Sequence, residues 1–100
     1  MRFLRRRPPL DARSARLRPA EHVTRVQKGG RSVLLDMDHE RYFGMDEVGT
    51  RVWELLQEGL AFETIVVRLT EEYDAPRERI EADVELFLGR LVESRLVEGQ

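Results

Sequence analysis

The sequence predicts an α+β fold of the winged helix-turn-helix type, with a three-stranded antiparallel sheet followed by three helices. Three observations predict this fold. Residues 22–45 contain extended segments separated by turn residues, residues 46–94 change to helical periodicity, and 100 residues fit one domain. Cysteine is absent, which excludes disulfides and thiolate chemistry, and no apolar run approaches the ~20 residues that span a membrane. We therefore expect a cytoplasmic protein.

Residues 1–20 are expected to form a basic disordered arm, and residues 21–98 are expected to form the folded domain. The arm holds three of the four prolines and seven arginines against one aspartate, a balance of +6. Because the whole chain has a net charge of −2, residues 21–100 carry a balance of −8. An acidic body repels nucleic-acid phosphates, which argues against a DNA-binding winged helix, the main alternative from another class of function.

The three strands are expected where β-branched and aliphatic residues cluster between turns. Gly29-Gly30 can adopt the positive φ angles of a tight hairpin, and Asp38-His39 makes a second turn. In the middle strand, two sets of residues alternate with the period of two expected of a half-buried strand. The strands are expected at residues 22–28, 31–37 and 40–45, and the alternating sets are Val33, Leu35, Met37 and Ser32, Leu34, Asp36.

The three helices are expected from apolar residues at helical spacing. The carboxylate of Asp46 can cap the first helix, Gly59 suits a left-handed stop, and Pro76 fits the start of the third helix. The apolar faces are Val48, Val52, Leu55 and Leu56 (residues 47–57, with Trp53 on the flank), then Phe62, Ile65, Val66, Leu69 and Tyr73 (62–73), then Ile80, Val84, Phe87, Leu88 and Leu91 (77–94), before a short extended tail at Leu96-Val97.

No residue pattern predicts catalysis, a metal site or a cofactor site. His22 and His39 have no cysteine and no third ligand at metal-binding spacing. The three serines lack the glycine pattern of a nucleophile elbow, and Gly29-Gly30 precedes a strand instead of a phosphate-binding helix. We therefore expect a protein that is not an enzyme, with no metal and no cofactor.

Two features predict a peptide-binding slot. Leu86 lies about 240° around the third helix from Ile80, off the apolar face, and its angular neighbours are Arg79, Asp83 and Arg90. Such a residue is expected at the lip of a groove, although a singly exposed leucine is the simpler alternative.

The third strand, ERYFGM, is expected at a sheet edge without proline or lysine, which leaves it open to another chain. An extended peptide could pair with this edge and place alternate side chains against the third helix. The same edge could pair two copies into a homodimer, or the arm or a helix could cover it.

The sequence also resembles a known family. The runs HERYFGMDEVGTRVWELLQEG and PRERIEADVELFLGRLVESRLVE are similar to PqqD-like proteins, also called RiPP precursor recognition elements, and the resemblance covers residues 22–98. Its most specific part is the strand-to-helix junction from Tyr42 to Gly49, followed by Trp53 to Leu56. The resemblance implies a winged helix-turn-helix without catalytic residues. In that family the leader of a ribosomally made precursor peptide adds to the third strand and contacts the third helix.

Within this family, the chain is most similar to the stand-alone proteins of lasso-peptide pathways. The resemblance then implies delivery of the leader peptide to a leader peptidase, which is a cysteine protease, and to a macrolactam synthetase. Service to a radical-SAM enzyme, as in the pyrroloquinoline quinone pathway, is the alternative, and the arginine-rich arm departs from the family pattern. The leader-binding positions that the resemblance implies are Arg41, Tyr42, Phe43, Gly44 and Met45 on the strand, and Asp83, Leu86, Phe87, Arg90 and Leu91 on the helix.

Overall fold

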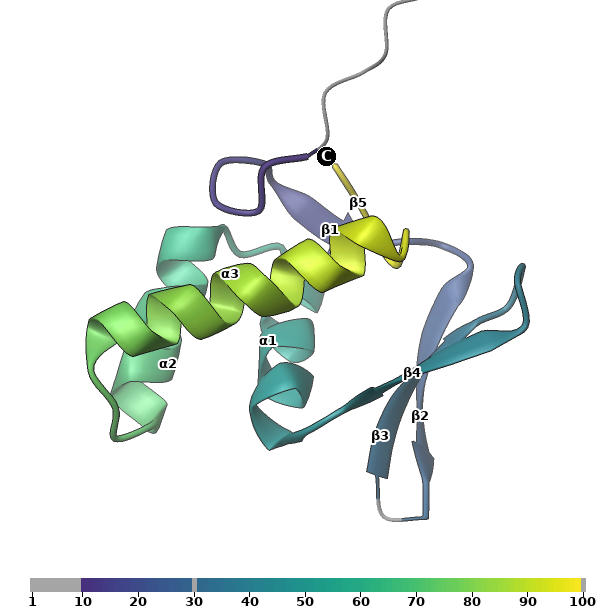
Figure 1. The fold of residues 1–100 in the computed structure, drawn as a ribbon, viewed down its shortest axis with the longest axis horizontal. Coiled ribbons are helices and arrows are strands. Elements are labelled where there is room, and N and C mark those ends of the chain that lie inside the picture. Colours follow the sequence, from purple (N-terminus) through teal and green to yellow (C-terminus); the bar gives the residue numbers. More distant parts are fainter. Residues whose placement is uncertain (1–9, 30, 100) are drawn as a thin grey trace, which may run out of the picture.

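The computed structural model describes residues 10–29 and 31–99, and it has the expected α+β architecture (Figure 1). An antiparallel sheet of order β2-β3-β4 precedes three helices, and a second, two-stranded sheet joins β1 to β5. In Figure 1 the helices lie to one side of the three-stranded sheet, and α3 crosses in front of α1. The elements are β1 (Leu17–Pro19), β2 (Val23–Lys28), β3 (Arg31–Asp36), β4 (Arg41–Met45), α1 (Glu47–Gln57), α2 (Phe62–Glu72), α3 (Arg77–Glu93) and β5 (Val97–Gly99).

Local signals fix the junction between the sheet and the helices. The Asp46 carboxylate accepts a hydrogen bond from the Gly49 backbone N–H at 2.7 Å, so Asp46 caps α1 as predicted. Gly29, in the β2–β3 turn, and Gly59, after α1, both have positive φ angles, which glycine adopts without steric cost. The end of β4 is therefore joined to the start of α1 by a single capping residue.

Of the two alternating sets of side chains in β3, the one that faces the core is the set that contains polar residues. Leu34 is buried together with Ser32 and Asp36, whereas Val33 and Leu35 are only half-buried on the outer face of the sheet. The helices therefore cover the face that carries Leu34. In α1, Trp53 is buried in the core, while Val48 is 37% exposed and does not join it, in contrast to the inward position expected from periodicity.

The N-terminal segment differs from the expected disordered arm in its described part. Leu17 is only 2% exposed, lies in β1 and pairs with Gly99 of β5. The guanidinium of Arg13 lies 3.1 Å from carboxylate oxygens of both Glu81 and Glu85 on α3. The expected domain boundary at residue 21 is therefore wrong, because the fold includes the strand before it. The remainder of the predicted arm, residues 1–9, lies outside the described residues.

One hydrophobic core joins the helices to both sheets. Its buried members come from all three helices and from β1, β3, β4 and β5. Among the described residues, no helix is both long and apolar enough to cross a bilayer. The largest fully buried apolar side chains of this core are Trp53, Leu34, Leu55, Leu56, Ile65, Leu69, Leu88 and Leu91.

Candidate functional site

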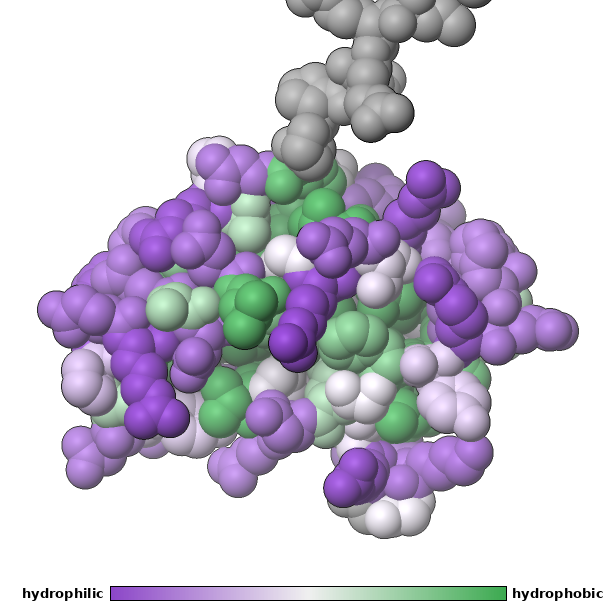
Figure 2. All heavy atoms as spheres, viewed as in Figure 1, coloured by the Kyte–Doolittle hydropathy of each residue, from purple (hydrophilic) through white to green (hydrophobic). Residues whose placement is uncertain are grey.

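A groove of about 380 Å³ lies between the N-terminal half of α1 and α3. Four of the five residues expected on the third helix line it, and Leu86 is 58% exposed at its edge. In the view of Figure 2, hydrophobic residues gather along the middle of the molecule, and hydrophilic residues surround them. The lining residues are Asp46, Val48, Gly49, Val52, Arg79, Asp83, Val84, Leu86, Phe87 and Arg90.

Phe87 connects this groove to the edge strand. Its ring meets the ring of Phe43 on β4 edge to face, with centroids 6.3 Å apart and an interplanar angle of 64°. On the other side, a Cβ atom added to Gly49 would lie 3.0 Å from a carbon of the Phe87 ring. The ring therefore lies directly against the α1 backbone, which explains why a glycine suits this position in the strand-to-helix junction.

The rim of the groove carries charges of both signs. Arg79 and Asp83 form a long ion pair of 3.8 Å with both side chains well exposed. Such a pair contributes little to stability, because solvent screens it and two flexible side chains must be held. Arg90 also lines the groove, as does Asp46, whose carboxylate is already engaged as the cap of α1. The groove therefore combines apolar lining residues with the exposed pair of Arg79 and Asp83, whose charges a charged partner could engage without breaking a strong internal interaction.

The edge strand β4 places its residues on two faces. The pairing of Leu34 with Phe43 puts Phe43 on the core side, together with Met45. Tyr42 points to the outer face, where it is 69% exposed and the Lys28 ammonium lies 5.2 Å from its ring centroid. In the described part of the chain, β4 pairs with β3 alone, so the backbone groups along its second edge are open.

The residues that line the groove differ from those expected on the third helix and on α1. Leu91 is fully buried in the core, at 0% exposed, and does not line the groove. Conversely, Val48 and Gly49 line it, although the helical periodicity of α1 placed Val48 in the core. An apolar residue in the first turn of a helix can face either the core or a groove beside that helix, and only the packing of α3 decides between them.

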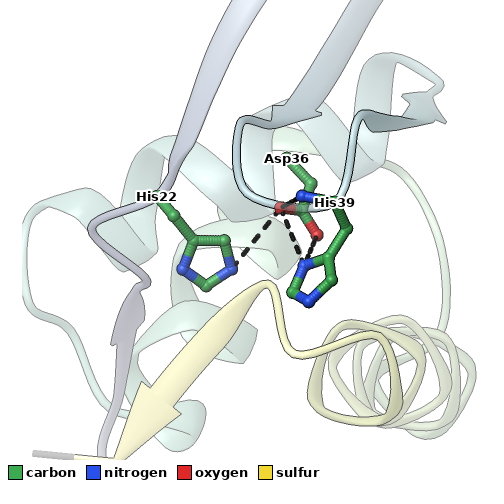
Figure 3. Close-up of side chains that lie close together, drawn as sticks. All are labelled: His22, Asp36 and His39. Carbon is green, nitrogen blue, oxygen red and sulfur yellow. Dashed lines mark hydrogen bonds and ion pairs between the residues drawn. The ribbon is translucent and has the colours of Figure 1, made fainter.

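Arg41, the first residue of β4, is held by the buried carboxylate of Asp36. Figure 3 shows this carboxylate with the two histidines beside it. Asp36 is 1% exposed, and it accepts a hydrogen bond from Arg41 at 2.8 Å and from the backbone N–H groups of Asp38 and His39 at 3.1 Å. Arg41 also donates to the Ser94 carbonyl at 3.0 Å. The start of β4 is thereby tied both to the β3–β4 turn and to the residue that follows α3.

The two histidines of the chain also meet at Asp36. His39 Nδ1 lies 3.0 Å and His22 Nε2 lies 3.8 Å from its carboxylate oxygens. The sequence argument found no third group for these histidines, because Asp36 comes close to His22 only through the pairing of β2 with β3. Burial alone would raise the pKa of Asp36, but the hydrogen bonds from Arg41 and His39 outweigh burial and hold this pKa well below its ordinary value.

Because the pKa of Asp36 is depressed in the folded state, its contribution to stability is present above the unfolded pKa and is lost as the pH falls below it. We expect Asp36→Asn to lower the free energy of unfolding at pH 7, and this deficit relative to the wild type to shrink below about pH 4. Urea denaturation at pH 7, 5 and 3 measures both effects. Asp38→Asn, an exposed carboxylate of the same turn, controls for loss of charge at pH 7. A deficit that grew at pH 3 would contradict this account.

A larger hollow, of about 700 Å³, lies on the other side of α1 beside the β2–β3 hairpin. Its main charged groups already have partners: Arg51 makes two hydrogen bonds to Glu72, at 2.8 and 2.9 Å, and a third to Glu54 at 3.2 Å. A ligand there would have to compete with these ion pairs. The groove between α1 and α3 is therefore the better candidate site, because it has several apolar side chains in its lining and adjoins the open edge of β4.

Comparisons with known proteins agree with this architecture. The family model for "Coenzyme PQQ synthesis protein D (PqqD)" matches residues 31–97. The solved structure "TbiB1 in Complex with the TbiA(beta) Leader Peptide" is 36% identical, with a TM-score of 0.75 over 83% of this chain and 96% of that chain. "Lasso peptide synthetase B1 complexed with the leader peptide" is 23% identical and shares the fold, with a TM-score of 0.77 over 84% and 99% of the two chains. No curated protein matches the chain.

The residues that the PqqD family model matches include the strand-to-helix junction and all three helices. The chain therefore belongs to the PqqD family.

Proposed function

We propose that this protein binds the leader segment of a ribosomally made precursor peptide, most closely a lasso-peptide precursor, and has no catalytic role of its own. The observation that carries the proposal is the open edge of β4 beside the apolar groove of α3, with Phe43 and Phe87 in contact between them. The similarity to TbiB1, solved with a leader peptide, supports the same use of this surface.

The geometry suits strand addition. A peptide paired with β4 would gain backbone hydrogen bonds along the whole strand, and every second side chain would point to the same face as Phe43. That face leads to α3 and to the groove that Val48, Leu86 and Phe87 line. Apolar leader side chains would enter the groove, while Asp83 and Arg90 at its rim would set the register by pairing with leader charges.

The opposite edge of the sheet is a poorer acceptor for a peptide. The strand β2 carries Arg25 and Lys28, and an edge lysine is one of the devices that block pairing with another chain. The strand β4 contains neither proline nor lysine.

A disordered leader loses chain freedom when it docks. Since a net hydrogen bond contributes only about 1 kcal/mol, the apolar anchors beside β4 must supply most of the free energy that exceeds this loss.

We further propose that the bound leader is delivered to a leader peptidase of the cysteine protease class and to a macrolactam synthetase in the cytoplasm. Holding the leader near the enzyme raises the local concentration of the precursor, which increases rate without any catalytic group in this chain. A radical-SAM partner is the alternative, and it would leave the leader-binding step unchanged. Peptidase assays with and without this protein separate the two, because only the first partner predicts faster leader cleavage.

The test of leader binding is a calorimetric titration of the full chain with the leader peptide encoded beside it, followed by hydrogen–deuterium exchange. We expect one-to-one binding with micromolar or tighter Kd, and slower amide exchange in β4 (Arg41–Met45) in the complex. The strand β2 is the internal control, because it is the other edge of the same sheet. Binding with protection at β2 and none at β4 would contradict the proposed edge, and no binding would contradict the proposed function.

A further inference from the structure

The cluster of His22, Asp36 and His39 has the composition and spacing of a metal site (Figure 3). The candidate ligand atoms are one imidazole nitrogen from each histidine and one carboxylate oxygen, and all lie within 4.8 Å of one another. Two imidazoles and one carboxylate form a ligand set that Zn²⁺ uses in proteins, with a water at the fourth position. The bond lengths of such a site place neighbouring ligand atoms about 3.3 Å apart.

The observed separations are close to that requirement. His39 Nδ1 lies 3.2 Å from Asp36 Oδ1, and His22 Nε2 lies 3.8 Å from the same oxygen. The side chain of His39 is about half exposed and lies in a turn. Its ring can therefore shift until its nitrogen and those of its neighbours reach metal-ligand spacing, without disturbing the core. The backbone below the cluster is fixed, because the Met37 N–H donates to the His22 carbonyl at 2.8 Å.

A second observation comes from His22. Its Nε2 atom is buried and has no hydrogen-bond partner among the described residues, although it faces the Asp36 carboxylate. A buried polar atom without a partner costs free energy, and a metal ion between the two groups would satisfy it. Arg41 donates to Asp36 Oδ2, whereas Oδ1 faces both histidines and also accepts from the backbone N–H groups of Asp38 and His39. A metal-binding carboxylate is commonly held in this way by an outer hydrogen-bond partner.

We propose that His22, Asp36 and His39 bind one Zn²⁺ ion, with Arg41 as the outer partner of the carboxylate. The ion would connect the residue before β2 to the β3–β4 turn and, through Arg41, to the first residue of the edge strand. This inference concerns a site away from the α3 groove and does not depend on leader binding.

The test is a titration of the untagged, chelator-treated full chain with ZnCl₂ at pH 7.5 in the absence of any peptide. We expect a one-to-one complex, and His22→Gln and His39→Gln should each weaken binding at least about tenfold, because each removes one of three ligands. Asp38→Asn, in the same turn but outside the cluster, is the matched control and should bind as the wild type does. Substituting Co²⁺ should give the visible absorption bands of a four-coordinate site in the wild type and not in the histidine variants.

Circular dichroism of each variant separates loss of a ligand from loss of the fold. Saturation at one equivalent with the expected ranking of variants supports the site. The absence of saturable binding at millimolar Zn²⁺ would overturn it, as would undiminished affinity in both folded histidine variants, which would assign the metal to surface carboxylates. Because no leader peptide is present, either result leaves the leader-binding proposal to its own experiment.

Discussion

We expect Leu17→Ala to lower the free energy of unfolding by about 3 kcal/mol, within the range for truncating a fully buried leucine. Leu17 is 2% exposed and belongs to the hydrophobic core, and its strand β1 pairs with β5. The substitution removes apolar contacts inside a packed core and leaves a cavity that the surrounding strands fill only in part. Chemical denaturation monitored by circular dichroism measures the change.

Leu10→Ala is the matched control for Leu17, because the same substitution is made in the same N-terminal segment at a side chain that is 40% exposed. We expect it to cost less than about 1 kcal/mol. Equal losses for the two variants would show that β1 does not belong to the cooperative core.

A chain that lacks residues 1–20 also loses Ala20 and the pairing of Arg13 with α3, so it should be less stable than the Leu17→Ala variant. Binding experiments therefore require the full chain.

The contrast between α1 and β1 shows why part of the fold was predictable. Residues 47–57 carry a capping aspartate, apolar residues at helical spacing and a terminal glycine, so each local signal agrees with the helix that forms. The strand β1 has three residues, one of them Arg18, and its partner β5 lies about 80 residues later in the chain. No periodicity can appear in three residues, and its charged neighbours have the composition of a disordered segment.

The same limit applies to the candidate site. Leu86 could be predicted at the groove because its angle around α3 separates it from the core face, and it is exposed there. The burial of Asp36 could not be predicted, because it depends on Arg41 and His39 converging from the next strand and the turn. The groove floor at Gly49 depends on the approach of Phe87, which is a tertiary contact. Local patterns therefore identified the elements of the site, while packing decided which side chains line it.

We expect Phe87→Ala to weaken leader binding by about 30-fold or more, which corresponds to at least about 2 kcal/mol at an aromatic anchor. Phe87 lines the groove and contacts both Phe43 on the edge strand and Gly49 on α1, so its loss opens the floor at the point nearest to the added peptide. Leader titration by calorimetry measures the change. Because Phe87 is partly buried in the free protein, the free energy of unfolding of this variant is measured beside its leader affinity.

Leu86 separates recognition from folding in this experiment. It is 58% exposed, so Leu86→Ala should leave the free energy of unfolding within about 0.5 kcal/mol of the wild type and still weaken leader binding several-fold. Val67→Ala on α2 is the matched control, since Val67 is also exposed and lies outside the groove. If Phe87→Ala and Leu86→Ala both weaken binding while Val67→Ala does not, the groove is the recognition surface. Unchanged affinity in a folded Phe87→Ala variant would instead leave the backbone edge of β4 as the main source of affinity, and the specificity for side chains would then lie outside α3.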